Sequence, residues 1–220
     1  MFYPNGFWSV YPLLERNRPP CLSLTGVPAN AQIAMHQLLL QMGLNDRQAE
    51  AVAALFTERK ALATGDYLIR EGDIVKGIGF VVDGACRYFY NTRQGDEITR
   101  WVTLKANFVT SLSGFITGGP ASETIQAIVP SQVLMAPKER WYQLLADHAF
   151  MQQLWTRSME QMYLGMENRV FQLIALNAAE RYQWMVHNQP EFIEQVPDKY
   201  LASMLGITPR HLSRLSNRSR

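Results

Sequence analysis

The residues best suited to chemistry lie within the last two dozen positions of the chain. From position 208 to the end of the sequence there are four Arg and no acidic residue. An Arg side chain can donate two hydrogen bonds to one guanine, and each such pair contributes about 1–3 kcal/mol of base discrimination. A segment whose charge is all of one sign is also attracted to phosphates. These residues therefore indicate duplex DNA as a binding partner.

The spacing of small and turn-forming residues in the same segment predicts two short helices joined by a tight turn. Ala202 is small where two helices could cross closely, and Gly206 can adopt the left-handed backbone that ends a helix. Thr208 can cap the next helix, and Pro209 suits its first position because no donor is lost there. This pattern is a helix-turn-helix. Its expected apolar face consists of Leu201, Leu205, Ile207, Leu212 and Leu215.

The polar residues of the second helix should point outward, because the apolar residues occupy its other face. Outward residues near the start of such a helix reach base edges in the major groove. An alternative is a plain helical hairpin with a solvated basic face, but it explains neither the Ala-x3-Gly-x5-Leu spacing nor the single sign of the charge. The candidate DNA contacts of this helix are Thr208, Arg210, His211, Ser213 and Arg214, of which Thr208 and Ser213 suit either phosphates or bases. Lys199, Arg218 and Arg220 are candidates for additional phosphate contacts.

Upstream, short apolar runs separated by Gly and Asp turns predict an antiparallel roll or sandwich. Helical spacing precedes these runs from Ala31 to Lys60, with a capping-box pattern at Asn45 and Gln48, and it resumes at about Lys138. The predicted strands cover residues 67–70, 79–82, 85–90, 97–102, 124–129 and 132–135.

A long amphipathic stretch runs from Phe150 to about His187, with breaks that the pattern does not locate. Its apolar stripe needs a surface to pack against. That surface is either a second copy of the chain or the rest of the same subunit. The segment 188–190, Asn-Gln-Pro, is the expected hinge into the terminal helices.

Two regions resemble the Crp/Fnr family of bacterial transcription regulators. One is the segment 199–209, Lys-Tyr-Leu-Ala-Ser-Met-Leu-Gly-Ile-Thr-Pro, with Leu-Ser-Arg at 212–214. The other is the series Gly-Asp…Glu-Gly-Asp…Phe-Val-Val-x-Gly within residues 65–90. The resemblance extends over roughly residues 40–216, and it implies an α+β fold with an antiparallel β-roll of cyclic-nucleotide-binding type, a long dimerisation helix and a C-terminal helix-turn-helix.

On this resemblance the chain divides into four parts. Residues 1–35 would form an irregular arm, and residues 36–148 a cyclic-nucleotide-binding-like roll with flanking helices. Residues 149–188 would form the dimerisation and connecting helices, and residues 189–220 a truncated helix-turn-helix domain. The implied function is that of a homodimeric transcription regulator that binds a near-palindromic DNA site.

Two departures from the family pattern change what we expect at the DNA. The family's recognition helix often carries an Arg and then a Glu before a second Arg; here Pro209 and Arg210 stand in those places, and only Arg214 matches. Glu accepts a hydrogen bond from cytosine, so the preferred site should differ. The sequence also stops five residues after Leu215, so we expect no contacts from the family's β-hairpin wing.

The segment 108–124 bears on the effector. Family members that bind cyclic AMP hold its cyclic phosphate with an Arg, whereas here that place falls on Ala121, with Glu123 nearby. A buried phosphate without a cation and beside a carboxylate is poorly stabilised, so we expect no cyclic-nucleotide binding of the usual kind. Ser111, Ser113 and Thr124 could hydrogen-bond another small-molecule effector. Alternatively, they are ordinary loop hydroxyls in a structural scaffold.

Composition argues against several other classes. The two Cys, Cys21 and Cys86, are too few for the iron–sulfur cluster of the family's oxygen-sensing branch, and Cys86 is expected to be a small buried hydrophobe rather than a redox switch. None of the four His lies in the strand region, and no nucleophile, phosphate or zinc motif is present. We therefore expect no enzyme, metal or cofactor.

The net charge of +2 means that the basic excess is local rather than spread over the chain. No stretch approaches the ~20 apolar residues that a membrane span needs, which favours a cytoplasmic bacterial protein. The main alternative function is a sensor or adaptor that keeps the roll but no longer binds DNA.

Overall fold

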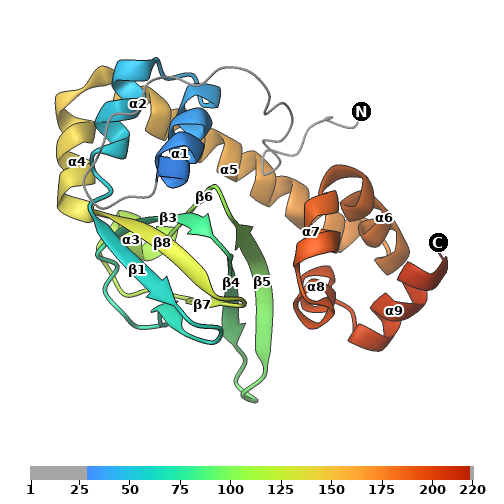
Figure 1. Ribbon diagram of the computed structural model, residues 1–220. Helices are drawn as coiled ribbons and strands as arrows, with labels where there is room; N and C mark the ends of the chain where they lie inside the picture. The colour runs from blue at the N-terminus through green and yellow to red at the C-terminus, as the bar shows by residue number, and fades with distance from the viewer. Residues whose placement is uncertain (1–28, 219–220) are drawn as a thin grey trace.

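The chain folds into an α+β structure in which a β-roll, a long helix and a small helical domain follow one another (Figure 1). The structure, a computed structural model, describes residues 29–218. Within that range no helix is both long enough and apolar enough to cross a bilayer. The helices are α1 (Ala29–Gln41), α2 (Asp46–Ala53), α3 (Leu112–Thr117), α4 (Lys138–Asp147), α5 (Ala149–Ala175), α6 (Ala178–Asn188), α7 (Pro190–Gln195), α8 (Asp198–Leu205) and α9 (Pro209–Arg218).

The roll consists of two four-stranded antiparallel sheets. The first has the order β1 (Glu58–Leu62), β8 (Ser131–Pro137), β3 (Gly77–Asp83) and β6 (Asn107–Val109). The second has the order β2 (Tyr67–Ile69), β7 (Thr124–Ala127), β4 (Ala85–Asn91) and β5 (Glu97–Leu104). Strands β3 and β4 are joined at Gly84, whose φ of +90° favours glycine. Because β3 and β4 belong to different sheets, this turn connects the two layers.

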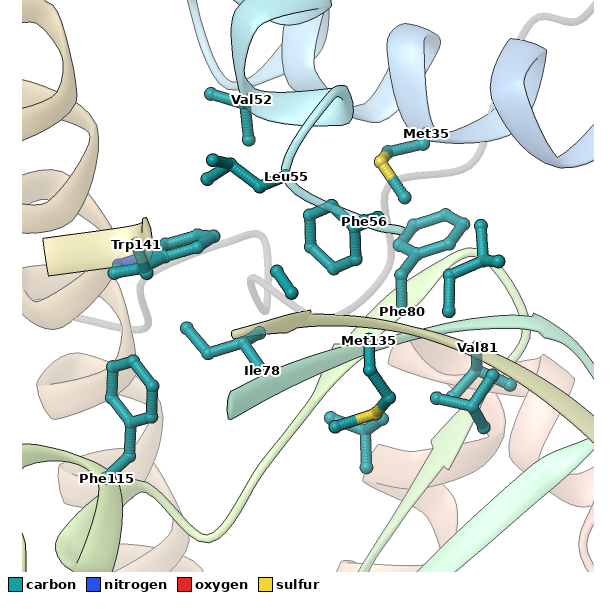
Figure 2. Close-up of a cluster of buried hydrophobic side chains, with 14 of the residues drawn as sticks. Met35, Val52, Leu55, Phe56, Ile78, Phe80, Val81, Phe115, Met135 and Trp141 are labelled. Carbon is teal, nitrogen blue, oxygen red and sulfur yellow. The ribbon is translucent and has the colours of Figure 1, made fainter. Parts of the chain in front are cut away.

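The main hydrophobic core fills the interior of the roll and continues to the helices that cover it. Figure 2 shows Met35 of α1 close to the aromatic rings of Phe56 and Phe80, and Val52 of α2 beside Leu55. Both rings are almost completely buried. The Phe56 ring meets Trp141 of α4 edge-on, with 6.5 Å between ring centroids. Helices α1, α2 and α4 are therefore part of the same folding unit as the roll.

Helix α5 begins inside this core and leaves it. Met151 and Leu154, in its first two turns, are buried in this core. Farther along, the helix extends from the roll toward the C-terminal helices (Figure 1). It ends before Asn177, whose side chain accepts hydrogen bonds from the backbone N–H groups of Ala179 and Glu180. The Glu180 carboxylate accepts in return from the Asn177 N–H, completing a capping box that starts α6.

Most of the predicted elements are present, and the capping box at Asn45 and Gln48 is confirmed. The helix predicted up to Lys60 is wrong at its end, because Glu58–Leu62 forms strand β1 and pairs with β8. The irregular arm predicted for residues 1–35 is wrong for its last part, because α1 begins at Ala29 and buries Met35 against the roll. Residues 1–28 lie outside the described chain.

Candidate nucleic-acid interface

The turn between α8 and α9 has the geometry that its sequence predicts. Gly206 adopts the left-handed conformation, with φ of +67°. Its N–H donates to the carbonyl of Ser203, and the Ile207 N–H donates to the carbonyl of Ala202, each over 3.0 Å. These two bonds form a Schellman motif, which satisfies carbonyls that the end of α8 would otherwise leave free. The turn therefore sets the direction in which α9 leaves.

Helix α9 starts with a cap and buries one face. The His211 N–H donates to the Thr208 hydroxyl over 3.2 Å, so Thr208 is the N-cap residue and Pro209 takes the first helical position. Leu212 and Leu215 are buried. They belong to a cluster that also contains the apolar residues of α8. The predicted apolar face is thus confirmed at these positions.

The opposite face of α9 is open to solvent. The five candidate DNA-contacting residues of this helix, Thr208, Arg210, His211, Ser213 and Arg214, are all exposed. Within residues 29–218, neither Arg210 nor Arg214 forms an ion pair. Both guanidinium groups are therefore free to meet a phosphate or a base edge.

Of the three candidate phosphate contacts, only the Lys199 side chain lies within the part of the chain that the structure describes. Lys199 is exposed near the start of α8, with its Nζ 4.6 Å from the centre of the Tyr200 ring. Arg218 is the last residue of α9, and its side chain is outside the described part. Arg220 lies outside the described residues altogether.

The C-terminal end of α8 is held by two Arg residues that sequence reasoning missed. Arg169 of α5 donates to the Met204 carbonyl, and Arg181 of α6 donates from Nε to the Leu205 carbonyl over 3.0 Å. Cations favour helix C-termini, where carbonyl groups leave a partial negative charge. Burial, and next the nearby charge of Arg181, lower the pKa of Arg169 from its usual value. No sequence pattern pairs Arg169 with a carbonyl thirty-five positions away.

Inside the roll, Ala121 stands where the sequence resemblance would place a phosphate-binding Arg, and the charges around it are already paired. Ala121 and Glu123 are both buried, and Glu123 is 4% exposed. The Arg100 Nε donates to the Glu123 carboxylate over 2.8 Å. Burial tends to lower the pKa of Arg100, but the attraction of Glu123 outweighs it and the pKa is raised. The carboxylate thus already has a cation from its own chain.

The three candidate ligand-binding hydroxyls do not share a common partner. The Thr124 hydroxyl accepts from the Glu71 N–H over 3.1 Å. The Ser113 hydroxyl lies 3.1 Å from that of Ser122, in an exposed pair. The Ser111 hydroxyl is fully buried and has no hydrogen-bond partner within residues 29–218. The structure therefore assigns two of the three to local hydrogen bonds, and their role toward an effector stays a prediction.

Cys86 lies in β4 and is buried in the main core. Burial raises the pKa of its thiol to about 12, so it stays protonated at neutral pH. Within the described range, no group of three or more His, Cys, Asp and Glu side chains could hold a metal ion. The expectation of a small hydrophobe agrees with this position.

Comparison with known proteins gives one family match and several relatives. Residues 59–148 match the cyclic nucleotide-binding domain family. The fumarate and nitrate reduction regulatory protein of Escherichia coli is 25% identical, over 84% of this chain and 78% of the relative. The protein of the same name from Vibrio cholerae is also 25% identical, with the same coverage.

Solved structures share the fold. FixK2 from Bradyrhizobium japonicum has a TM-score of 0.64 at 15% identity and covers 73% of this chain and 83% of its own. The c-di-GMP-responsive global regulator CLP from Xanthomonas campestris has a TM-score of 0.63 at 16% identity and covers 79% of this chain and 91% of its own. At these identities, the similarity of the structures concerns the fold alone.

The raised pKa of Cys86 predicts slow thiol chemistry. In a Cys21→Ser variant, Cys86 is the only thiol. A pKa of about 12 leaves roughly one thiolate in 10⁴ at pH 8, and labelling should stay slow until the pH is far above the ordinary range. Labelling with a chromogenic thiol reagent at pH 8 should accelerate at least about 100-fold once urea unfolds the protein. Rapid labelling of the native protein would contradict the buried position.

Proposed function

We propose that the chain is a transcription regulator of the Crp/Fnr type, and that it is a homodimer that binds a near-palindromic duplex through α9. We further propose that its roll does not respond to cyclic AMP. The observation that carries the proposal is the pair Arg210 and Arg214, exposed on a capped helix whose opposite face is buried.

The recognition helix is suited to guanine-containing sites. Arg210 and Arg214 are one turn apart on α9, so their side chains extend from neighbouring positions on one face. A guanidinium group pairs with guanine O6 and N7 in the major groove, which a carboxylate does not do. With Arg210 in the place where the family often has Glu, we propose that a guanine is read there in place of a cytosine. Lys199 would add a phosphate contact from α8.

The second half of α5 supports a dimer. Tyr163, Met166, Val170 and Leu173 recur at alternating spacings of three and four, and each is about half or more exposed, from 48% for Leu173 to 66% for Tyr163. Such spacing is the a/d seam of a coiled coil. Ile174, which is 81% exposed, widens the same stripe. A continuous apolar stripe in water is unfavourable, and a second copy of α5 would cover it.

A dimer built on α5 has a direct consequence for the DNA. Two-fold symmetry would place two α9 helices on the same side of a duplex, where they could enter successive major grooves about one helical turn apart. The site would then be a near-palindrome. The sequence-specific part of the binding energy would come from α9, and the salt-dependent part from phosphate contacts.

The ion pair of Arg100 and Glu123 supports a roll that does not bind cyclic nucleotides. A cyclic phosphate placed near Glu123 would bring two negative charges together in a poorly solvated environment. Arg100 cannot neutralise both at full strength, because Glu123 already accepts its hydrogen bond. Any effector of this roll would therefore be of another chemical class.

The DNA-binding proposal is tested by the double variant Arg210→Ala/Arg214→Ala. A duplex selected by the wild-type protein from random sequences should bind the variant at least about tenfold more weakly, because two base-reading cations are lost. Fluorescence anisotropy at several salt concentrations measures the affinity. The matched control is Arg93→Ala/Arg140→Ala, which removes the same charge from exposed positions elsewhere and should bind like the wild type. Equal affinities for both variants would refute the base-reading assignment, and no selected sequence at all would favour the adaptor.

The dimer proposal is tested by Met166→Glu/Val170→Glu. Two carboxylates in the middle of the apolar seam should prevent association, since burying unpaired charges is strongly unfavourable. Sedimentation equilibrium should then give the mass of one chain, against two for the wild type. Gln153→Glu, at an exposed position nearer the start of α5, is the control and should stay dimeric. A double variant that still dimerises would place the interface elsewhere.

The effector proposal is tested by calorimetric titration of the purified protein with cyclic AMP and with cyclic GMP. We expect no saturable heat at ligand concentrations up to about 1 mM, where even a weak site with a binding free energy near −4 kcal/mol would be half filled. A family member that binds cyclic AMP serves as the positive control. Saturable binding that disappears when the roll is unfolded would overturn the proposal.

A further inference from the structure

Helix α8 lies along the free edge of a sheet in the roll (Figure 1). Strand β5 is the last strand of its sheet, next to β4. An edge strand has backbone groups without a strand partner. Here the Thr99 N–H donates to the Ser203 hydroxyl of α8 over 2.9 Å, and Thr99 is buried. The helix-turn-helix thus supplies an acceptor for a backbone group of the edge strand.

Arg87 of β4 makes a second link at the same place. Its residue is 5% exposed. Its guanidinium group lies 4.0 Å from the centre of the Phe89 ring and 4.6 Å from the centre of the Tyr200 ring of α8. On the roll side it pairs with Glu97, and its Nε donates to Gln126 over 2.9 Å. Cation–π contacts strengthen when the cation is desolvated, as it is here.

Apolar packing extends the contact beyond these polar groups. One buried cluster contains Val102 and Leu104 of β5 together with Leu201 and Leu205 of α8. The Trp101 ring of β5 also lies against the Phe192 ring of α7, with 5.1 Å between centroids. The roll and the terminal helices therefore pack around one shared apolar cluster.

The contact leaves the DNA-reading surface open. Tyr200 and Ser203 lie three positions apart, on the face of α8 that meets β4 and β5. Lys199, Arg210 and Arg214 are exposed in the same arrangement. Docking against the roll is thus compatible with reading a half-site, and what it restricts is the position of the reading helix.

We propose that Arg87, Thr99, Tyr200 and Ser203 together determine the spacing between half-sites that the protein accepts. These residues hold the helix-turn-helix against the roll, and the roll is in turn fixed to α5. In a dimer paired through α5, both α9 helices would then have fixed positions. Two recognition helices in fixed positions lose less conformational freedom on binding and fit only one distance between half-sites. Recognition helices on a flexible connection fit several distances. This inference rests on the proposed function.

The test compares two variants, of which one loses this contact and the other keeps it. Tyr200→Leu/Ser203→Ala, called the Leu/Ala variant below, removes the ring that faces Arg87 and the hydroxyl that accepts a hydrogen bond from Thr99. Tyr200→Phe/Ser203→Thr keeps a ring and a hydroxyl, and is the matched control. Each is titrated with the selected duplex, with the same duplex lengthened or shortened by one base pair between half-sites, and with a single half-site.

The wild type and the control should bind the altered spacings much more weakly than the selected one. The Leu/Ala variant should lose about 10- to 100-fold in affinity for the selected spacing and should bind all three spacings about equally. Its affinity for a single half-site should equal that of the wild type, which shows that α9 is still folded and able to bind. A Leu/Ala variant that keeps the wild-type spacing preference would overturn the inference.

Hydrogen exchange gives a second readout that needs no DNA. The Thr99 amide should exchange faster in the Leu/Ala variant than in the wild type and the control, because it loses its acceptor. An unchanged exchange rate would also overturn the inference. If the wild type binds no duplex, both the proposed function and the spacing inference fail. If the wild type binds its duplex but the Leu/Ala variant keeps the same spacing preference, only the spacing inference fails and the proposed function stands.

Discussion

Helix α5 carries apolar residues along its whole length but buries only some of them, and the arrangement of the molecule depends on this difference. Its first turns contribute Met151 and Leu154 to the core of the roll. Farther along, its apolar residues at heptad spacing face solvent, and between them Arg169 reaches the carbonyl end of α8. Helix α5 therefore contributes to the core of the roll, carries the proposed dimer seam and donates a hydrogen bond to the helix-turn-helix.

Buried polar groups make the roll more than a passive scaffold. Glu123 and Arg87 are buried charged side chains, and each is paired with a partner that is partly exposed, Arg100 for Glu123 and Glu97 for Arg87. Gln126 also accepts a hydrogen bond from Arg87. Removing the partner of a buried charge is costly, because the charge that remains is left uncompensated. Such pairs therefore fix geometry. The first lies where the sequence resemblance would place a phosphate-binding Arg, and the second joins strands β4, β5 and β7 of the roll to Tyr200 of α8. Strand β7 carries Gln126 and begins at Thr124, next to Glu123, so both pairs involve neighbouring positions of the chain.

Much of the fold could be predicted from local patterns. The Gly-Asp turns and short apolar runs predicted the strands β2 to β5, β7 and β8, and the segment Ala202 to Leu215 predicted the turn, the cap and both faces of α9. The exceptions have a common cause. Glu58 to Lys60 has a sequence compatible with either a helix end or a strand, and only pairing with β8 makes it β1. Strand β6 is three residues long and is defined by its pairing with β3, so no periodicity could reveal it. Met35 needed the roll surface before a helix beginning at Ala29 could be expected.

The sequence by itself determined the chemistry of the candidate interface. The types and order of Thr208, Arg210, His211, Ser213 and Arg214 are readable because a cap, a turn and an amphipathic helix depend on neighbours within a few positions. The tertiary structure alone decided where that interface is held. Thr99 and Ser203 are 104 positions apart, and Arg87 and Tyr200 are comparably distant. Contacts of this kind follow from burying one shared apolar cluster and covering one sheet edge, and those are properties of the folded chain that no local pattern encodes.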